Sequence, residues 1–454
     1  MKITVVGTGH VGLVVGLCLA ETGHEVGCHD TDQRKIDSLN RGQAPFYEPH
    51  MEELLARNRS SGRLRFFSEL DPHINDAPVI FLCLGTPPLA DGEADLSSVE
   101  KVTRQIASHS SSYKLIVEKS TVPVLTGDRI HHTMRIYGGS AEFDVASNPE
   151  FLSEGTAVAD FLHPQRTVIG VESARAEKLL REVYAPILKQ SFPCPIHDPC
   201  PWRGRETALV VTNRNSAEVI KHASNSFLAA KISFINALSG LCERVGADVE
   251  QVAAGMGLDS RIGSSFLHAG VGFGGFCFPK DLQAFIRIAE KNGYDFRLLR
   301  EVERVNLEQM DRFFDKIKHA VWVLKGKRIG VWGLAFKPDT DDVRFAPALL
   351  VIEKLLREGA SIAAYDPRAI AEARAVLPDA SGAVTYCKSA EEAAAGADAL
   401  VIFTEWKEFL SADLDRLRAS MARPLILDGR NMFAPEEMQR RGFEYVSIGR
   451  MPAG

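Results

Sequence analysis

The first 30 residues alternate short apolar runs with a helical stretch, and glycine marks the junctions. Lys2–Val6 is apolar and ends at Gly7. A helical stretch continues to Ala20, and a second apolar run, His24–His29, ends at Asp30. Continuous apolar runs are typical of parallel strands that are buried on both faces of a sheet. The pattern therefore predicts strand, helix and strand in an α/β domain.

Two further apolar runs extend this predicted sheet. Val79–Leu84 is followed by Thr86 in a turn rich in glycine and proline, and Leu115–Val117 is soon followed by Ser120 and Thr121. Because ligands of open α/β sheets bind at the carboxyl ends of the strands, these hydroxyl groups are placed to reach a ligand. The alternative for each is an ordinary turn residue.

The same order of elements returns late in the chain. Lys327–Gly333 resembles Lys2–Gly7, a helical stretch Ala348–Glu358 follows, and an apolar run Ser361–Tyr365 ends at Asp366. A repeat of strand, helix, strand and acid predicts a second domain of the same kind. We therefore expect an α/β protein with two Rossmann-like, doubly wound domains.

A long helix is predicted between the two domains. Asn215–Val245 contains no proline and a single glycine, and its apolar residues recur at helical spacing. Lys221 and Asn225 are four residues apart and share one helical face, which either is solvated or faces a ligand. A helix of this length is well above the usual globular length, so we expect it to join the domains and to offer a dimer surface.

This organisation gives three expected segments. They are a first Rossmann domain at residues 1–205, a central helical and catalytic segment at 206–315, and a second Rossmann-like domain at 316–454.

Composition and charge are those of an ordinary globular enzyme. Of the 454 residues, 45% are hydrophobic and 25% are charged, and the formal net charge is −6, so neither nucleic acid nor a membrane surface is an expected partner. The apolar start could imitate a signal peptide, but glycines and His10 interrupt it. We expect a cytoplasmic protein with reduced thiols.

Three candidate metal ligands lie close together in the sequence Cys194-Pro-Ile-His197-Asp-Pro-Cys200. This spacing matches no common zinc motif, so we expect a proline-rich surface loop here and no metal site.

The glycines after the first strand form a dinucleotide-binding fingerprint. Gly7, Gly9 and Gly12 have the G-x-G-x-x-G spacing, and Asp30 follows the second strand. In such a motif the glycines allow a tight turn, close approach of a pyrophosphate and close helix packing. An acid at this position would bind both ribose hydroxyls, which favours NAD over NADP. The alternative is a glycine-rich turn without a ligand.

A single thiol lies in the glycine-rich segment 272–281. Cys277 follows three glycines and precedes a predicted Pro-Lys-Asp turn, which brings Lys280 and Asp281 near the sulfur. A nearby cation favours the thiolate, and the glycines would let the backbone approach a ligand, so the segment suggests covalent catalysis. The alternative is a buried structural cysteine.

The corresponding loop of the second domain, Phe336–Arg344, lacks the glycine fingerprint. This argues against a second dinucleotide. Lys337 and Arg344 suit a phosphorylated ligand of another kind, and the alternative is a solvated pair.

Together these motifs resemble the UDP-glucose/GDP-mannose dehydrogenase family over nearly the whole chain. The resemblance implies an NAD domain, a central dimerisation segment, a sugar-nucleotide domain and a homodimer. It implies oxidation of UDP-glucose to UDP-glucuronate by two NAD⁺; the alternative is the same chemistry on GDP-mannose or a UDP-N-acetylhexosamine. The matching segments are Gly7–Gly12, Asp30, Phe46–Pro49, Gly85–Pro87, Glu118–Pro123, Asn148–Glu154, Lys221 with Asn225, Gly272–Asp281, Phe336–Arg344 and Asp428–Asn431.

The resemblance also implies catalytic roles. Cys277 would form a thiohemiacetal and then a thioester. Lys221 would stabilise an oxyanion or shuttle a proton, with Asn225 bonded to the same oxygen. Water would be positioned and deprotonated by Thr121, Glu150 and Asp281, with Glu150 the favoured base.

Binding residues are implied in the same way. Arg261 would reach the diphosphate from the partner subunit of a dimer. The implied cofactor residues are Gly7, Gly9, Val11, Gly12, Asp30, Lys35, Thr86, Thr121, Glu154 and Arg344. The implied substrate residues are Glu150, Phe151, Leu152, Lys221, Asn225, Arg261, Phe273, Gly274, Lys337 and Arg430.

The sequence departs from the family pattern at three places. Lys35 stands where relatives can carry arginine, and Phe276 replaces the small serine usual before the cysteine. Residues 190–206 are longer and richer in proline and cysteine than the usual connection.

Overall fold

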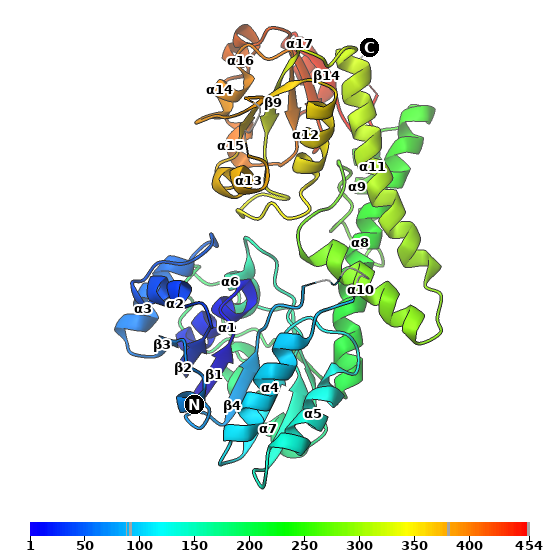
Figure 1. The fold of residues 1–454 in the computed structure, drawn as a ribbon. Coiled ribbons are helices and arrows are strands. Elements are labelled where there is room, and N and C mark those ends of the chain that lie inside the picture. Colours follow the sequence, from blue (N-terminus) through cyan, green and yellow to red (C-terminus); the bar gives the residue numbers. More distant parts are fainter. Residues whose placement is uncertain (88, 90–92, 379–381, 452–454) are drawn as a thin grey trace. The chain divides into compact units, whose positions relative to one another are not determined.

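The computed structural model describes residues 1–87, 89, 93–378 and 382–451. The chain forms two compact units. One comprises Met1–Ser224 and Gln283–Lys291, and the other comprises Asn225–Leu282 and Asn292–Gly454. Each unit contains a sheet of mainly parallel strands with helices around it, which confirms the predicted α/β class (Figure 1).

The sheet of the first unit has eight strands in the order β3-β2-β1-β4-β5-β6-β7-β8. All neighbours pair in parallel except β6 and β7, which pair antiparallel at Ser147 and Gly170. The first six strands thus have the doubly wound order, as predicted. The strands are β1 (Lys2–Val6), β2 (Glu25–His29), β3 (Leu64–Phe67), β4 (Val79–Leu82), β5 (Lys114–Glu118), β6 (Phe143–Ser147), β7 (Arg166–Gly170) and β8 (Ala208–Thr212).

Helices cover this sheet. Residues Gly12–Glu21 of α1 are all buried, because α1 packs between the sheet and two other helices, α3 and α6. This explains why α1 is apolar around its whole circumference. The helices are α1 (His10–Glu21), α2 (Gln33–Asn40), α3 (Met51–Ser60), η1 (Asp71–His73), α4 (Ser97–His109), α5 (Thr126–Tyr137), α6 (Ala157–Leu162) and α7 (Ala174–Leu188).

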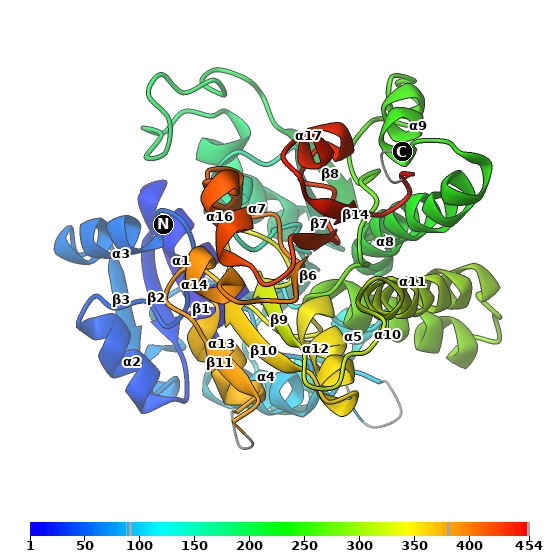
Figure 2. The same cartoon turned by 90° about the horizontal axis from the view of Figure 1, so that it is seen from above.

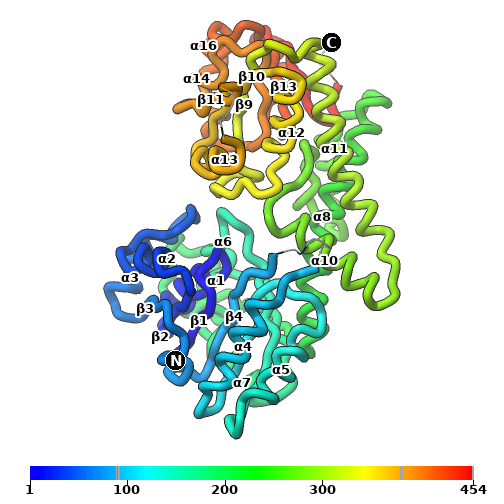
Figure 3. The backbone as a smooth tube through the Cα atoms, viewed as in Figure 1, coloured from blue at the N-terminus to red at the C-terminus, as the bar shows by residue number. Residues whose placement is uncertain are grey.

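The predicted central helix is present as α8 (Arg214–Val245), which is continuous over 32 residues. A Cβ at Gly240 would come within 2.4 Å of Nη1 of Arg312, the flexible end of a side chain that could move aside. The chain continues through α9 (Val249–Gly257), α10 (Cys277–Lys291) and α11 (Arg297–Val321), which can be followed from green to yellow-green in Figure 3.

The sheet of the second unit has six strands in the order β11-β10-β9-β12-β13-β14, all parallel (Figure 2). This is again the doubly wound order, so the predicted second Rossmann-like domain is present. Its strands are β9 (Arg328–Trp332), β10 (Ser361–Tyr365), β11 (Val384–Tyr386), β12 (Ala399–Ile402), β13 (Leu425–Asp428) and β14 (Glu444–Val446). Its helices are α12 (Pro347–Arg357), α13 (Ile370–Val376), α14 (Ala390–Ala394), α15 (Lys407–Leu410), α16 (Leu414–Ser420) and α17 (Pro435–Arg440).

The same type of turn follows the first strand of each sheet. Gly7 and Gly333 both have positive φ, 99° and 88°. The Gly7 N–H donates to the His29 carbonyl at 2.8 Å, and the Gly333 N–H donates to the Tyr365 carbonyl at 2.9 Å. The repeat seen in the sequence is therefore a repeat of backbone geometry.

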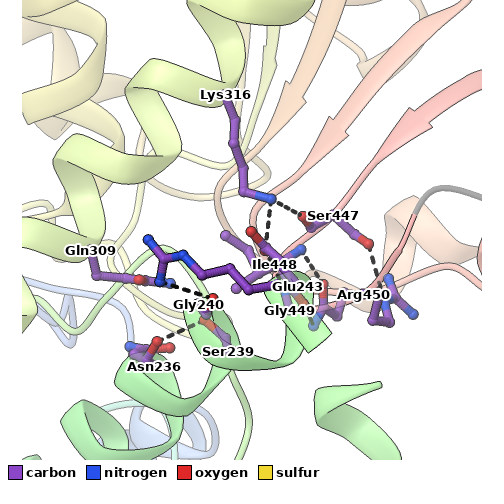
Figure 4. Close-up of polar contacts among 12 residues, drawn as sticks. Asn236, Ser239, Gly240, Glu243, Gln309, Lys316, Ser447, Ile448, Gly449 and Arg450 are labelled. Carbon is purple, nitrogen blue, oxygen red and sulfur yellow. Dashed lines mark hydrogen bonds and ion pairs between the residues drawn. The ribbon is translucent and has the colours of Figure 1, made fainter. Parts of the chain in front are cut away.

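The chain after β14 is bound to the long helices of the second unit (Figure 4). Glu243 Oε1 on α8 accepts hydrogen bonds from the Gly449 N–H at 2.6 Å and from Lys316 Nζ at 2.7 Å. Lys316 Nζ also donates to the Ser447 carbonyl at 3.0 Å. These contacts hold α8, α11 and the sheet together, so the helices form a fixed support for the loops that they carry.

Candidate active site

The three fingerprint glycines have different surroundings. A Cβ at Gly7 would lie 2.4 Å from the Cys83 carbonyl oxygen, and one at Gly12 would lie 1.9 Å from the Gly7 carbonyl oxygen. No protein atom among the described residues lies within 4 Å of a Cβ at Gly9. Gly7 and Gly12 are thus required by the fold, whereas the space at Gly9 is open, as expected where a pyrophosphate approaches the backbone.

Asp30 is held at the end of β2 by hydrogen bonds. Its Oδ2 accepts from the Thr8 N–H at 3.0 Å, the Thr8 hydroxyl at 2.8 Å and Lys35 Nζ at 2.9 Å. Burial raises the pKa of Asp30, but the hydrogen bonds from Lys35, Asp32 and Thr8 prevail and lower it to about 2. The carboxylate is therefore ionised near neutral pH and can accept hydrogen bonds from ribose hydroxyls.

Asp366, the equivalent acid of the second unit, is bound by groups of its own unit. Asp366 Oδ2 accepts from the backbone N–H of Leu334 at 2.7 Å and of Ala335 at 3.0 Å, and from Trp406 Nε1 at 3.1 Å. Asp366 is 1% exposed, so these internal bonds occupy it. The second Rossmann-like domain thus has no acid available for a ribose at this position.

Thr86 and Thr121 lie at the carboxyl ends of β4 and β5, as predicted. The Thr86 hydroxyl donates to the Thr121 carbonyl at 2.8 Å, so the structure brings these two predicted cofactor residues together. The Ser120 hydroxyl instead donates to the Leu82 carbonyl at 3.2 Å, which is a structural contact. Val11, in the first turn of α1, packs against the core of the first unit.

Glu150 and Lys221 form a buried ion pair in the first unit. Lys221 Nζ lies 2.8 Å from Glu150 Oε1, and both side chains are almost fully buried. The Leu152 N–H donates to Glu150 Oε2 at 2.5 Å, and Lys221 Nζ lies 5.7 Å from the centre of the Phe151 ring. A lysine and a carboxylate at this distance can exchange a proton, so the pair suits acid–base chemistry on an alcohol or on water.

Two charged residues position the loop that carries Glu150. Glu48 is buried and accepts hydrogen bonds from the Gly155 N–H at 2.7 Å and the Ala157 N–H at 2.8 Å. Lys119 Nζ donates to Asn148 Oδ1 at 3.1 Å, and burial lowers the pKa of Lys119 to about 8. Sequence reasoning gave neither residue a role of its own, although both lie in segments that carry the family resemblance.

Further predicted residues follow along this loop. Leu152 and Glu154 are partly buried, just before the two backbone N–H groups that bind Glu48. On the other side, the Arg166 guanidinium lies 3.8 Å from the centre of the Phe151 ring. The first unit thus gathers five predicted substrate or cofactor residues on or beside one loop; they are Glu150, Phe151, Leu152, Glu154 and Lys221.

Asn225 and Asp281 are joined in the second unit. Asn225 Nδ2 donates to Asp281 Oδ2 at 2.7 Å, and Lys280 Nζ lies 2.8 Å from Asp281 Oδ1. Asp281 is 1% exposed. An amide nitrogen carries two N–H groups, so this bond leaves a second donor on Asn225, as the predicted oxyanion contact requires.

The surroundings of Cys277 differ from the sequence prediction. Cys277 is the first residue of α10, and Pro279 to Asp281 continue the helix, so the predicted Pro-Lys-Asp turn was wrong. Proline is tolerated here because the first turn of a helix needs no N–H donor. The thiol is partly buried, and a helix N-terminus favours the thiolate form.

The glycines before Cys277 have little room for a side chain. A Cβ at Gly274 would lie 2.2 Å from the Phe345 carbonyl oxygen, and one at Gly275 would lie 2.7 Å from the Phe336 ring. The space beside these glycines is therefore filled by the chain between β9 and α12. A contact of Gly274 with substrate would have to use its backbone.

Buried amides on the long helices hold the glycine-rich segment. On α11, Asn306 accepts from the Phe273 N–H at 2.8 Å and donates to the Phe273 carbonyl at 3.0 Å. Gln309 Nε2 donates to the Gly270 carbonyl at 2.7 Å, and Asn236 Oδ1 on α8 accepts from the Gly270 N–H at 2.8 Å. Sequence reasoning missed these residues; polar residues on the buried face of an amphipathic helix were the available signal.

Arg430 connects two predicted substrate loops. Its guanidinium donates to the Gly272 carbonyl at 3.4 Å, to the Phe336 carbonyl at 3.2 Å and to the Phe403 carbonyl at 2.7 Å. Lys337 Nζ lies 5.4 Å from the centre of the Phe336 ring. Arg430, Lys337 and the Phe273–Gly274 segment are therefore brought together in the second unit.

Phe276, whose role the sequence did not explain, packs against the Arg344 guanidinium. The Arg344 guanidinium lies 4.3 Å from the centre of the Phe276 ring, and Lys280 Nζ lies 5.3 Å from it. Arg344 also donates two side-chain hydrogen bonds to Asp342, from Nε at 2.9 Å and Nη2 at 2.7 Å. A serine before Cys277 would lack both cation–π contacts.

Arg261 is exposed, unlike the other predicted substrate residues described above. Its side chain is 87% exposed and pairs with Asp259, at 2.6 Å. It therefore faces solvent in this chain.

The comparisons with known proteins place these motifs in a family. Models of the UDP-glucose/GDP-mannose dehydrogenase family match three parts of the chain: the NAD binding domain at residues 1–188, the central domain at 215–308 and the UDP binding domain at 330–435. The chain belongs to this family. The predicted dinucleotide fingerprint thus lies in the family's NAD binding domain. The loop Phe336–Arg344, which suits a phosphorylated ligand, lies in its UDP binding domain.

Relatives within the family are similar over their full length. A UDP-glucose 6-dehydrogenase of Rhizobium meliloti is 44% identical over 99% of this chain and 100% of its own length. The UDP-glucose 6-dehydrogenase TuaD of Bacillus subtilis is 45% identical over 99% of this chain and 93% of its own. The solved structure of a UDP-glucose dehydrogenase from Pyrobaculum islandicum is 36% identical, with a TM-score of 0.88 over 99% of this chain and 98% of that one.

Among the described residues, no helix combines the length and apolar character needed to cross a bilayer.

Proposed function

We propose that this protein is an NAD-dependent UDP-glucose 6-dehydrogenase, which oxidises UDP-glucose to UDP-glucuronate. The observation that carries the proposal is the 43–45% identity over essentially the whole chain to curated enzymes of that name. The ion pair of Lys221 with Glu150, the bond of Asn225 to Asp281 and the thiol at the start of α10 support it.

The reaction removes four electrons from one carbon. A primary alcohol, two NAD⁺ and water give a carboxylate, two NADH and three protons. NAD⁺, when bound, accepts the hydride of each oxidation, and Asp30 with the open backbone at Gly9 is suited to hold it. Lys221 and Glu150 receive the alcohol proton or stabilise the oxygen that loses it, and the second N–H of Asn225 donates to the same oxygen.

Cys277 holds the intermediate. Its thiolate adds to the C6 aldehyde to form a thiohemiacetal, and loss of the second hydride converts this to a thioester. Water then cleaves the thioester, which releases the acid and restores the thiolate. Glu150 acts as the base for this water, with Thr121 and Asp281 positioning it. The covalent bond explains how a reactive aldehyde stays on the enzyme between the two oxidations.

The stoichiometry of NADH tests the proposal. Purified protein with limiting UDP-glucose and excess NAD⁺ should form two NADH and one UDP-glucuronate per sugar consumed. Cys277→Ser should release no acid in the same assay, while Cys387→Ser, which alters a buried thiol of the second unit, should behave like the parent. Formation of one NADH per sugar, or none, would refute the four-electron reaction.

Substrate identity needs a separate comparison. GDP-mannose and the UDP-N-acetylhexosamines would use the same chemistry, so each should be assayed beside UDP-glucose. We expect the highest kcat/KM with UDP-glucose; a higher value for another sugar nucleotide would reassign the substrate while leaving the mechanism intact.

We further propose that the protein is a homodimer assembled through α8. Phe227, Phe234 and Leu241 recur every seven residues on this helix, and they are 68%, 55% and 52% exposed. Val245 adds a fourth exposed apolar side chain at 65%. An apolar stripe of this kind on one helix is typical of an interface between helices. The exposed Arg261 is then available to the diphosphate of the partner subunit.

The segment limits 1–205, 206–315 and 316–454 are our proposed domain boundaries. A cytoplasmic location stays a prediction from the sequence.

A further inference from the structure

Four potential metal ligands converge in the first unit, away from the residues assigned above. They are His163, at the end of α6, and Cys194, His197 and Cys200, in the connection between α7 and β8. One ligand atom from each lies within 4.8 Å of all the others. We propose that these four side chains bind one Zn²⁺ ion in a closed structural site.

The spacing of the ligand atoms fits a tetrahedral ion. Nε2 of His163 lies 3.2 Å from Sγ of Cys194, and the same sulfur lies 3.5 Å from Nδ1 of His197. Usual zinc–nitrogen and zinc–sulfur bond lengths place neighbouring ligand atoms about 3.3–3.8 Å apart in a tetrahedron. Two imidazoles with two thiolates are a preferred ligand set of zinc, and four protein ligands leave no open position for substrate.

The ring of His163 is held in the tautomer that a metal requires. Nε2 of Gln190 donates to the carbonyl oxygens of Leu162 at 2.9 Å and Ile187 at 2.7 Å, which fixes the orientation of the amide. Its Oε1, an acceptor, therefore faces His163 Nδ1 at 2.6 Å. Nδ1 must carry the proton, so the lone pair of Nε2 points to the cluster. Metal-binding histidines usually have such a second hydrogen bond.

The sulfur of Cys194 is similarly supported. The backbone N–H of His197 donates to Sγ at 3.3 Å, which stabilises a thiolate. Two aromatic rings pack on the His163 side: Phe192 with ring centres 5.7 Å apart and Trp202 with ring centres 6.2 Å apart, both stacked. These rings exclude water from the buried imidazole, which is 7% exposed.

The loop that carries three of the ligands indicates a structural role for the ion. Residues 189–207 contain no helix or strand, and Figure 2 shows them as a long sea-green loop. A loop of this length in a compact domain is usually held by something other than its own backbone. Zinc would bind it to the end of α6, the helix that follows the Glu150 loop. We expected no metal site from the sequence, because the spacing from Cys194 to Cys200 matches no common zinc motif. The fourth ligand, His163, lies outside that motif, 31 residues before Cys194.

The metal content of the protein tests the proposal. Full-length protein without a histidine tag, purified under reducing conditions, should hold about one zinc per chain by mass spectrometry of its metals. Cys200→Ser and His197→Ala should each lose most of it. Matched controls outside the cluster, Cys387→Ser and His268→Ala, should retain it, and circular dichroism should show that all four variants are folded.

Cobalt supplies an independent readout. Chelated protein reloaded with Co²⁺ should show thiolate-to-cobalt charge-transfer absorption and the visible bands of tetrahedral cobalt. Chelation should also lower the melting temperature and expose residues 190–206 to protease. The proposal is overturned if reduced protein binds no zinc after reloading, if the Cys200→Ser variant keeps its full content, or if a Cys194–Cys200 disulfide is present in place of metal.

Discussion

At the residue scale, the same amino acid type can serve the fold or the ligand, and the space around it decides which. Gly7 and Gly12 have protein atoms where a Cβ would be, whereas Gly9 has none. Glu118 and Asp30 show the same contrast for carboxylates. Asp30 receives several hydrogen bonds and is ionised, while Glu118 lies inside the first unit with one oxygen, Oε1, lacking a hydrogen-bond partner among the described residues.

Gly9→Val tests the assignment of the open space to the cofactor. Because a Cβ at Gly9 meets no described protein atom and the backbone of Gly9 is extended, the melting temperature should change little. The affinity for NAD⁺ should fall about tenfold or more, since the side chain would occupy the pyrophosphate position. Calorimetric titration with NAD⁺ measures this. Gly255→Val, at a second open position in α9, is the control and should bind NAD⁺ normally.

Glu118→Gln tests the protonation of this buried acid. Burial, and then the nearby charge of Glu218, raise the pKa of Glu118 well above its usual range. The native state therefore keeps the proton while the unfolded state loses it above about pH 4.3, so stability falls as pH rises, by at most about 1.4 kcal/mol per pH unit. Glutamine removes this penalty.

The melting temperature of Glu118→Gln relative to the parent should therefore rise between pH 5 and pH 8. Glu372→Gln, at an exposed glutamate on α13, should show no such trend. A constant difference across the pH range would mean that Glu118 is ionised in the folded protein.

At the element scale, the two long helices carry the site. Helix α8 bears Lys221 and Asn225 one turn apart, and α11 holds the segment before Cys277 through Asn306. Our proposal thus gives α8 two tasks: to position catalytic side chains and, through its exposed apolar stripe, to contact a second subunit.

Phe234→Glu tests the second of these tasks. A charge in the middle of the stripe should make the dimer dissociate, because burying an unpaired carboxylate costs several kcal/mol. Sedimentation or light scattering should then give half the mass of the parent. Val376→Glu, at a residue of α13 that is 63% exposed, should leave the dimer intact. A parent protein that is itself monomeric would contradict the proposed interface.

At the scale of the whole molecule, the chain contains two sheets in which six strands have the same order and the first strand is followed by the same glycine turn. The two domains differ in the residues around that turn. The first leaves Gly9 open and Asp30 partly exposed, while the second buries Asp366, and its Arg430 donates to the Phe336 carbonyl. One architecture can thus bind an NAD in one copy and a sugar nucleotide in the other.

The sequence by itself determined the features that are local in the chain. Both glycine turns, the acids that follow, the succession of strands and helices along the chain and the central helix depend on backbone preferences and on apolar spacing, which neighbouring residues set. The resemblance then supplied the site residues, and the structure places Thr86 beside Thr121, Lys221 beside Glu150 and Asn225 beside Asp281.

Only the tertiary structure decided the features that depend on residues far apart in the chain. Positions 274 and 275 need glycine because residues 336–347 fill the adjacent space, and Phe276 fits because Arg344 lies against it. The ligand cluster needs His163 from another element. Such contacts join positions that no linear spacing relates, since packing and coordination act through space.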